Sequence, residues 1–91
     1  MEQIFIIQQI VKKLSMLNTQ MVYVYLKHIL YGSQKIKCAL HALWDGERVG
    51  LIINNEEIYI TVNELRDIYI DNNEYYIKSD VMEIRIVPIN I

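Results

Sequence analysis

The amino-acid sequence predicts an α+β fold, in which an N-terminal αα-hairpin packs on a curved antiparallel sheet of five or six strands arranged as a meander. Near the N-terminus, apolar residues recur at spacings of three and four, which is typical of amphipathic helices. From Lys35 to Ile89, short runs alternate between apolar and polar residues, which is typical of half-buried strands. Turn-forming pairs separate these runs: Asp45-Gly46, Asn54-Asn55 and Asn72-Asn73. Helices that come first and strands that follow indicate α+β rather than an alternating α/β order.

Length and composition indicate one domain, 1–91, with the helical hairpin in 1–33 and the sheet in 35–89. Apolar residues make up 53% of the chain, more than a small domain can easily bury, which suggests a protein partner or self-association. The single cysteine, Cys38, excludes an internal disulfide. Polar residues interrupt the N-terminal apolar run, so we expect neither a signal peptide nor a membrane segment. The expected location is the cytoplasm, or the host cytoplasm for a phage-encoded protein.

Two helices are expected in the first third of the chain. The first runs from Glu2 to Leu17, and its polar residues form an outer face. The second runs from Gln20 to about Tyr31, with Thr19 as its N-cap and Gly32 as its left-handed C-cap. Because this second helix is apolar nearly all round, it should be covered on more than one side. Val22–Tyr25 also has the β-propensity of a strand, which is the alternative.

The sheet is expected to begin with a strand over Lys35–Leu43, for which a short helix is the alternative. A tight turn at Asp45-Gly46 follows, with Gly46 at positive φ. The strictly alternating stretch Arg48–Val62 then predicts a β-hairpin that turns at Asn54-Asn55.

The remaining elements are predicted with the help of local signals. Thr61 and Glu64 have the spacing of a capping box, which predicts a single helical turn near 63–67. Pro88 cannot donate to a strand ladder, so the chain end is expected at or just past a sheet edge. Three further strands complete the sheet: Ile68–Asp71, Glu74–Ser79 and Val81–Ile89.

Charge divides the chain into two unequal parts. Residues 1–38 carry five lysines against Glu2, a net charge of +4, whereas residues 39–91 carry four basic and ten acidic residues, a net charge of −6. The simpler interpretation is that the two parts pack on each other and keep solvated faces. The alternative is an acidic sheet that faces a basic partner.

Neither a metal site nor catalytic chemistry is predicted. Cys38 and His41 with His28 give three ligands where a structural zinc site needs four, and on a strand Cys38 and His41 would point to opposite faces. We therefore expect a buried thiol, an exposed imidazole and no cofactor. The three glycines are too scattered for a phosphate-binding loop, and no serine lies in a nucleophile elbow. An enzyme that uses a carboxylate cluster remains an alternative, because spatial neighbours cannot be read from sequence.

The outward face of the predicted sheet is the first candidate binding site. Tyrosine and arginine are enriched at the centres of protein interfaces, although tyrosine is also favoured in half-exposed strands that bind nothing. The residues predicted to bind a partner are Tyr59, Tyr69, Tyr76, Arg48, Glu57 and Arg85.

The helical hairpin is the second candidate surface, because its apolar residues cannot all face one small sheet. A two-fold homodimer would bury the excess. The residues predicted for this interface are Phe5, Ile6, Met21, Val24 and Tyr25.

The predicted function is that of a small non-catalytic protein-interaction module, of the kind that a phage or mobile element encodes to bind and inhibit a larger host protein. One alternative is a small-ligand binder that holds a nucleotide between tyrosines and Arg48 or Arg85. A second alternative is nucleic-acid binding through a lysine face, which the overall acidic charge disfavours. The lysines of that face are Lys12, Lys13, Lys27, Lys35 and Lys37.

Overall fold

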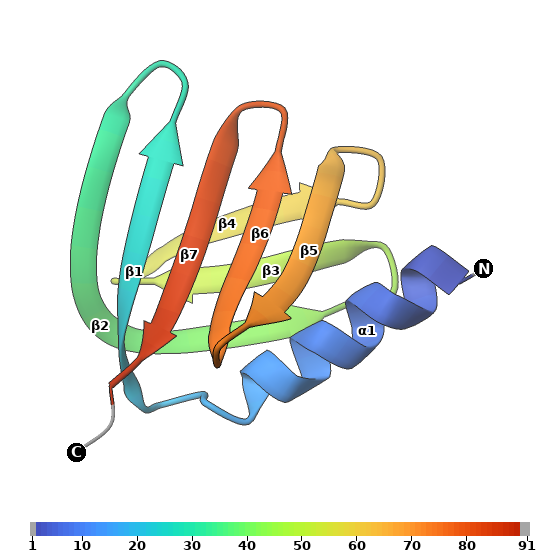
Figure 1. Ribbon diagram of the computed structural model, residues 1–91, viewed down its shortest axis with the longest axis horizontal. Helices are drawn as coiled ribbons and strands as arrows, with labels where there is room; N and C mark the ends of the chain where they lie inside the picture. Colours follow the sequence, from blue (N-terminus) through green and yellow to red (C-terminus); the bar gives the residue numbers. More distant parts are fainter. Residues whose placement is uncertain (1, 90–91) are drawn as a thin grey trace.

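The computed structural model describes residues 2–89 and has an α+β fold with one N-terminal helix and seven antiparallel strands (Figure 1). The strands form one sheet in the order β4-β3-β2-β1-β7-β6-β5, which is not closed, since β4 and β5 are its edges. Strand β1 therefore lies at the centre, between its hairpin partner β2 and β7 from the other end of the chain. The elements are α1 (Glu2–Ser15), β1 (Met21–His28), β2 (Gly32–Trp44), β3 (Arg48–Ile53), β4 (Glu56–Thr61), β5 (Leu65–Asp71), β6 (Glu74–Ser79) and β7 (Met82–Pro88).

The long strand β2 turns the sheet into two layers. Its first part, Gly32–Ala39, pairs with β1, and its second part, Leu40–Trp44, pairs with β3. Figure 1 shows that β3 and β4 consequently lie behind β5, β6 and β7. The outward faces of the two layers therefore point in opposite directions.

One apolar core fills the space between the layers. The predicted alternation is confirmed in β2, β3, β4 and β7, because the apolar set that was expected inward is buried or half-buried there and its charged and tyrosine neighbours face outward. Helix α1 packs against β2 and β5 and covers the side that the curled sheet leaves open. Its buried residues are Ile7, Val11 and Leu14. The buried strand residues include Val22, Val24, Leu40, Leu51, Ile60, Ile77, Ile84 and Ile86.

Hydrogen bonds connect the turn after α1 to the second part of β2. Asn18 Nδ2 donates to the carbonyl oxygen of Ala42 (3.3 Å), and Asn18 Oδ1 accepts from the Ala42 N–H (2.8 Å). The Thr19 N–H donates to the carbonyl of Leu40 (3.1 Å). These bonds satisfy backbone groups of β2 where β1 no longer runs beside it.

The prediction of a second helix is wrong, as is the count of five or six strands. Residues Met21–His28 form β1, and the hairpin that it makes with β2 replaces the predicted αα-hairpin. Thr19 is not an N-cap but lies at a positive φ of 73° in the preceding turn. Gly32 does have the predicted left-handed φ, at 81°, but at the start of β2 rather than at a helix end.

Two local predictions at the other end of the chain are also corrected. Thr61 and Glu64 make the reciprocal bonds of a capping box, yet no helical turn follows, because the chain enters β5 at Leu65. Pro88 is not at a sheet edge but ends the interior strand β7, opposite Val22. Strand β6 pairs with β7 only as far as Ile86, so Pro88 has a strand partner on the β1 side alone, and its missing N–H is tolerated as at an edge.

Candidate binding face

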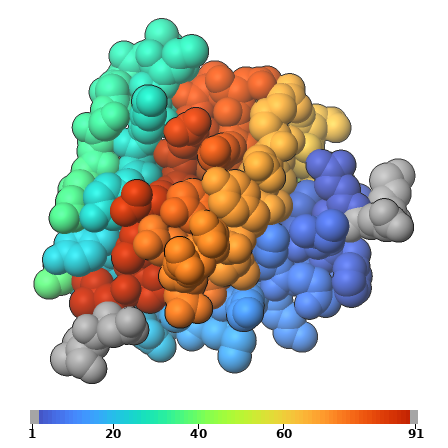
Figure 2. All heavy atoms as spheres, viewed as in Figure 1, coloured from blue at the N-terminus to red at the C-terminus, as the bar shows by residue number. Residues whose placement is uncertain are grey.

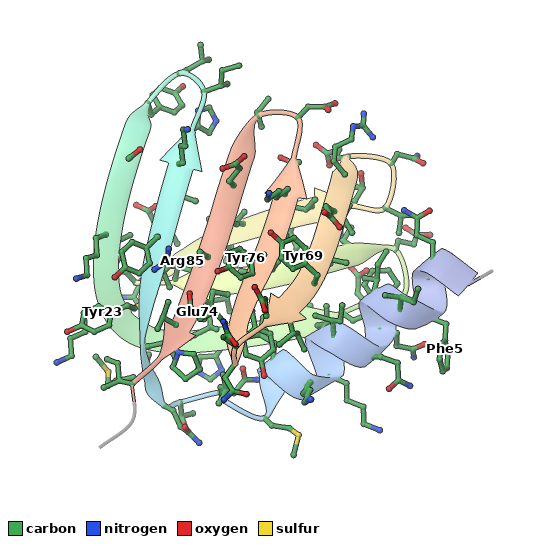
Figure 3. All side chains as sticks on the ribbon, viewed as in Figure 1. Phe5, Tyr23, Tyr69, Glu74, Tyr76 and Arg85 are labelled. Atoms are coloured by element: carbon green, nitrogen blue, oxygen red, sulfur yellow. The ribbon has the colours of Figure 1, made fainter. Side chains whose placement is uncertain are left out.

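Five outward residues lie directly opposite one another on five neighbouring strands. Lys35 on β2 pairs with Tyr25 on β1, and Tyr25 pairs with Arg85 on β7. Arg85 pairs with Tyr76 on β6, which pairs with Tyr69 on the edge strand β5. Figure 3 shows Tyr69, Tyr76 and Arg85 in line on one face of the sheet. We call this set the tyrosine–cation row.

The members of the row stack on one another. The rings of Tyr69 and Tyr76 are almost parallel, with centroids 4.7 Å apart and planes 11° apart. The guanidinium carbon of Arg85 lies 4.4 Å from the Tyr25 ring centroid, and Lys35 Nζ lies 5.4 Å from it. Because neighbouring strands are about 4.7–4.9 Å apart, rings that stand up from adjacent strands meet face to face. The row therefore presents ring edges, hydroxyl groups and cationic groups outward.

Further cations border the row on both sides. Lys35 Nζ and Lys37 Nζ lie 4.5 Å and 5.9 Å from the ring centroid of Tyr23. At the other end, Lys78 Nζ lies 5.6 Å from the ring centroid of Tyr69. A cation held over a ring face is attracted by the ring quadrupole.

Glu74 holds the centre of the row in place. Its Oε1 atom lies 3.0 Å from Arg85 Nε and accepts a hydrogen bond from the Tyr76 hydroxyl (3.3 Å). Partial burial, and next the negative charge of Glu74, raise the pKa of the Tyr76 phenol, which therefore stays a neutral donor at physiological pH.

A hollow of about 350 Å³ opens in this face beside the row, where Lys27, Glu83 and Lys78 lie opposite one another on β1, β7 and β6. Tyr25 and Lys27 of β1 line one side, and Tyr76 and Lys78 of β6 line the other. In Figure 2 the side chains of these strands form the visible face, and α1 lies beside them rather than over them. The hollow is therefore open to a partner.

The six residues predicted to bind a partner do not form one surface. Tyr69, Tyr76 and Arg85 share the front face, whereas the other three lie on β3 and β4 of the rear layer. There the guanidinium carbon of Arg48 lies 4.3 Å from the Tyr59 ring centroid, and the Tyr59 hydroxyl donates to Glu57 Oε2 (3.4 Å). The bend in β2, which the sequence analysis did not foresee, separates the two groups.

The predicted dimer interface is also divided. Val24 is fully buried in the core and Tyr25 belongs to the tyrosine–cation row, so neither can lie on a helical interface. Phe5 and Ile6 on α1 are 60% and 51% exposed, and Figure 3 shows Phe5 pointing away from the sheet. Met21 is also exposed, at the start of β1.

Cys38 and His41 occupy opposite faces of β2, with the thiol buried and the imidazole exposed, as predicted. Within residues 2–89, no three side chains of His, Cys, Asp or Glu come together as a metal site would require. No helix in this described range is long and apolar enough to cross a membrane.

Sequence reasoning missed half of the front face, because it assigned residues 20–31 to a helix. The β-propensity of Val22–Tyr25 was the signal that could have placed these residues on a strand.

Comparison of the chain with protein-family models, curated proteins and solved structures found no match. The functional inference therefore rests on the geometry of this face alone.

Proposed function

We propose that this chain is a non-catalytic protein-interaction module that binds a larger protein through the tyrosine–cation row. The observation that carries the proposal is the register of five neighbouring strands. Each strand places an aromatic or cationic side chain directly opposite that of its neighbour, and no described helix or strand covers them. Tyrosine and arginine provide a large share of the binding energy at protein interfaces. Inhibition of the partner, through occupation of a surface that it needs, is the activity that we propose with this binding.

The stacking within the row favours binding because it fixes side chains before a partner arrives. Immobilising a flexible side chain on binding costs about 0.5–1.5 kcal/mol. Tyr69 and Tyr76 are already held against each other, and Arg85 is held by Glu74 and Tyr25. A partner that meets this row loses less of its binding energy to side-chain ordering.

The same geometry disfavours the nucleic-acid alternative. Single-stranded nucleic acids bind aromatic residues whose ring faces are open for base stacking. In this row the faces of Tyr69 and Tyr76 meet each other, and Arg85 lies over the ring of Tyr25.

Partner capture by tagged protein from a lysate of its native cells tests the proposal. We expect a specific partner to be retained by the wild-type chain and lost by the double variant Tyr69→Ser/Tyr76→Ser. Tyr59→Ser is the matched control, because Tyr59 also stacks with an arginine but lies on the rear layer. Circular dichroism of each variant verifies folding. Equal capture by the double variant and the wild type would contradict the proposal.

A further inference from the structure

The chemistry of the hollow points to the kind of partner. We infer that the hollow in the tyrosine–cation face accepts carboxylate side chains from an acidic segment of a protein partner. This inference rests on the proposed function and specifies the chemistry that the same face recognises.

Two lysines of the hollow form no ion pair with a carboxylate of residues 2–89. Lys27 and Lys78 lie opposite Glu83 on either side of β7, and Lys78 also lies opposite Asp67 of β5, but neither lysine comes within ion-pair distance of these carboxylates. The nearby Arg85, in contrast, is engaged with Glu74. With Arg85 paired to Glu74, Lys27 and Lys78 against the single acid Glu83 leave the lining with a net charge of +1, although the whole chain carries −2.

The charge of the face is also graded across the strands, which orients the incoming segment. Cations gather on β1 and β2, at Lys27, Lys35 and Lys37. Acids gather at the opposite edge, at Asp67 and Asp71 of β5. An acidic segment is thus attracted to the β1 side of the hollow and repelled by the β5 edge, and such complementarity fixes register.

The tyrosines suit the methylene groups of an acidic side chain. Tyr25, Tyr69 and Tyr76 supply apolar ring edges around the hollow, and the hydroxyl groups of Tyr25 and Tyr69 can donate hydrogen bonds to a carboxylate. A volume of about 350 Å³ is at the lower end of the range for ligand sites, about 300–1,000 Å³. It can therefore hold side chains of a segment that continues across the sheet.

Nucleotides are anionic as well, but this site lacks what they require. A base needs an open ring face, and the faces of Tyr69 and Tyr76 that meet are closed to it. Backbone N–H groups at helix N-termini and bidentate arginines give phosphate sites a geometric specificity that a lysine, as a point charge, does not supply. Here the hollow is lined by strands, and Arg85 is already paired with Glu74.

Selection of random peptides displayed on phage tests the inference without knowledge of the natural partner. We expect peptides selected on the wild-type chain to be enriched in Asp and Glu. Binding of a synthetic selected peptide should weaken about tenfold in Lys27→Gln/Lys78→Gln, since two exposed ion pairs contribute roughly 1–2 kcal/mol together. It should also weaken with added salt. The matched control Lys12→Gln/Lys13→Gln removes the same charge from α1 and should leave binding unchanged.

Several outcomes would overturn the inference. These are a selection that yields no binders, binders without acidic enrichment, or binding that survives in Lys27→Gln/Lys78→Gln. Tighter binding of ATP or oligo(dT) than of the acidic peptide, lost in the same variant, would assign the hollow to nucleotides or nucleic acid instead.

Capture of the natural partner separates this inference from the proposed function. If Tyr69→Ser/Tyr76→Ser loses the partner while Lys27→Gln/Lys78→Gln retains it, the proposed function is supported and the inference of an acidic partner segment is wrong. If both double variants retain the partner, both proposals fail.

Discussion

At the scale of single residues, Thr19 adopts a backbone conformation that its side chain disfavours. Its φ of 73° is rare for a β-branched residue, and the hydrogen bond from its N–H to Leu40 holds it there. The other positive-φ residues between residues 2 and 89 are Asn54, Asn55, Asn72, Asn73, Gly32 and Gly46. We expect Thr19→Asn to raise the free energy of unfolding by about 1 kcal/mol, measured by urea denaturation. Thr61→Asn is the control and should lower it, because the Thr61 hydroxyl is bonded to Glu64.

Two exposed carboxyl groups make stability depend on pH. Hydrogen bonds from the backbone N–H of Glu47 and from the Arg48 side chain lower the pKa of Asp45 below its usual 3.8. The Thr61 N–H and hydroxyl lower the pKa of Glu64 below its usual 4.5. A carboxyl whose pKa is lower in the folded state stabilises the fold above its unfolded pKa, and this contribution is lost as pH falls through the folded value.

The expected result is a melting temperature that falls as the pH drops below these usual values. In Asp45→Asn/Glu64→Gln the melting temperature should fall less over the same range of pH. Thermal melts at a series of pH values would measure this difference. A decrease as steep as that of the wild type would show that these two groups do not contribute.

The hairpin turns were the part of the structure that single residues predicted best. Asn54-Asn55, Asn72-Asn73 and Gly46 adopt positive φ at the predicted hairpin turns, because these residues accept that conformation at little cost. The capping box shows the limit of such signals. Its bonds form between Thr61 and Glu64, but burial of Leu65 and the pairing of β5 with β6 draw the following residues into a strand.

At the scale of elements, the strand β1 could not be recognised from hydrophobicity alone. Its outward residues Tyr23 and Tyr25 are largely apolar, so they hide the alternation with the buried Val22 and Val24 and resemble a helix that is apolar all round. The partners that satisfy its backbone are β2, next in sequence, and β7, from the far end of the chain. The second of these pairings leaves no local trace in the sequence.

The β1–β2 hairpin carries an apolar tip, Ile29-Leu30-Tyr31, whereas the hairpins that turn at Asp45-Gly46, Asn54-Asn55 and Asn72-Asn73 have no apolar side chain at these positions. Its conformation is held by polar contacts: the Leu30 N–H donates to His28 Nδ1 (3.0 Å) and the Ile29 N–H to the Val81 carbonyl (2.8 Å). Because Leu30 is 77% exposed, we expect Leu30→Asn to change the free energy of unfolding by no more than about 0.5 kcal/mol. Binding of the dye ANS should decrease.

Leu40→Asn is the matched substitution in the core, where Leu40 is fully buried, and it should abolish cooperative unfolding. A large loss of stability in Leu30→Asn would show that the tip packs against the rest of the protein.

At the scale of the whole molecule, the sequence predicted the inward and outward sets of the strands that it recognised, but neither the strand β1 nor how the layers are arranged. Strict alternation placed Tyr59, Tyr69 and Tyr76 on outward faces, and none of them is buried. Whether those faces coincide depends on where β2 bends between its two partners, a property of long-range pairing rather than of local pattern. The candidate face was therefore half predicted, and its β1–β2 half was found only from the structure.

Self-association stays a prediction, but its interface is revised, because Val24 is buried and Tyr25 lies on the tyrosine–cation face. Helix α1 leaves Phe5 and Ile6 exposed, and Ile6 borders a groove beside the free edge of β5, lined by Leu65 and Ile68. We expect sedimentation velocity to show a dimer that strengthens with concentration, since a two-fold contact would bury these residues. Phe5→Ser/Ile6→Ser should be monomeric, whereas Met16→Ser, which changes a more exposed apolar residue just beyond α1, should not change the distribution.

Because α1 lies beside the tyrosine–cation row and not over it, the monomeric variant should still capture the partner as well as the wild type does. A wild-type chain that remains monomeric at high micromolar concentration would rule out this dimer. Loss of partner capture in Phe5→Ser/Ile6→Ser would instead show that the helix belongs to the partner-binding surface.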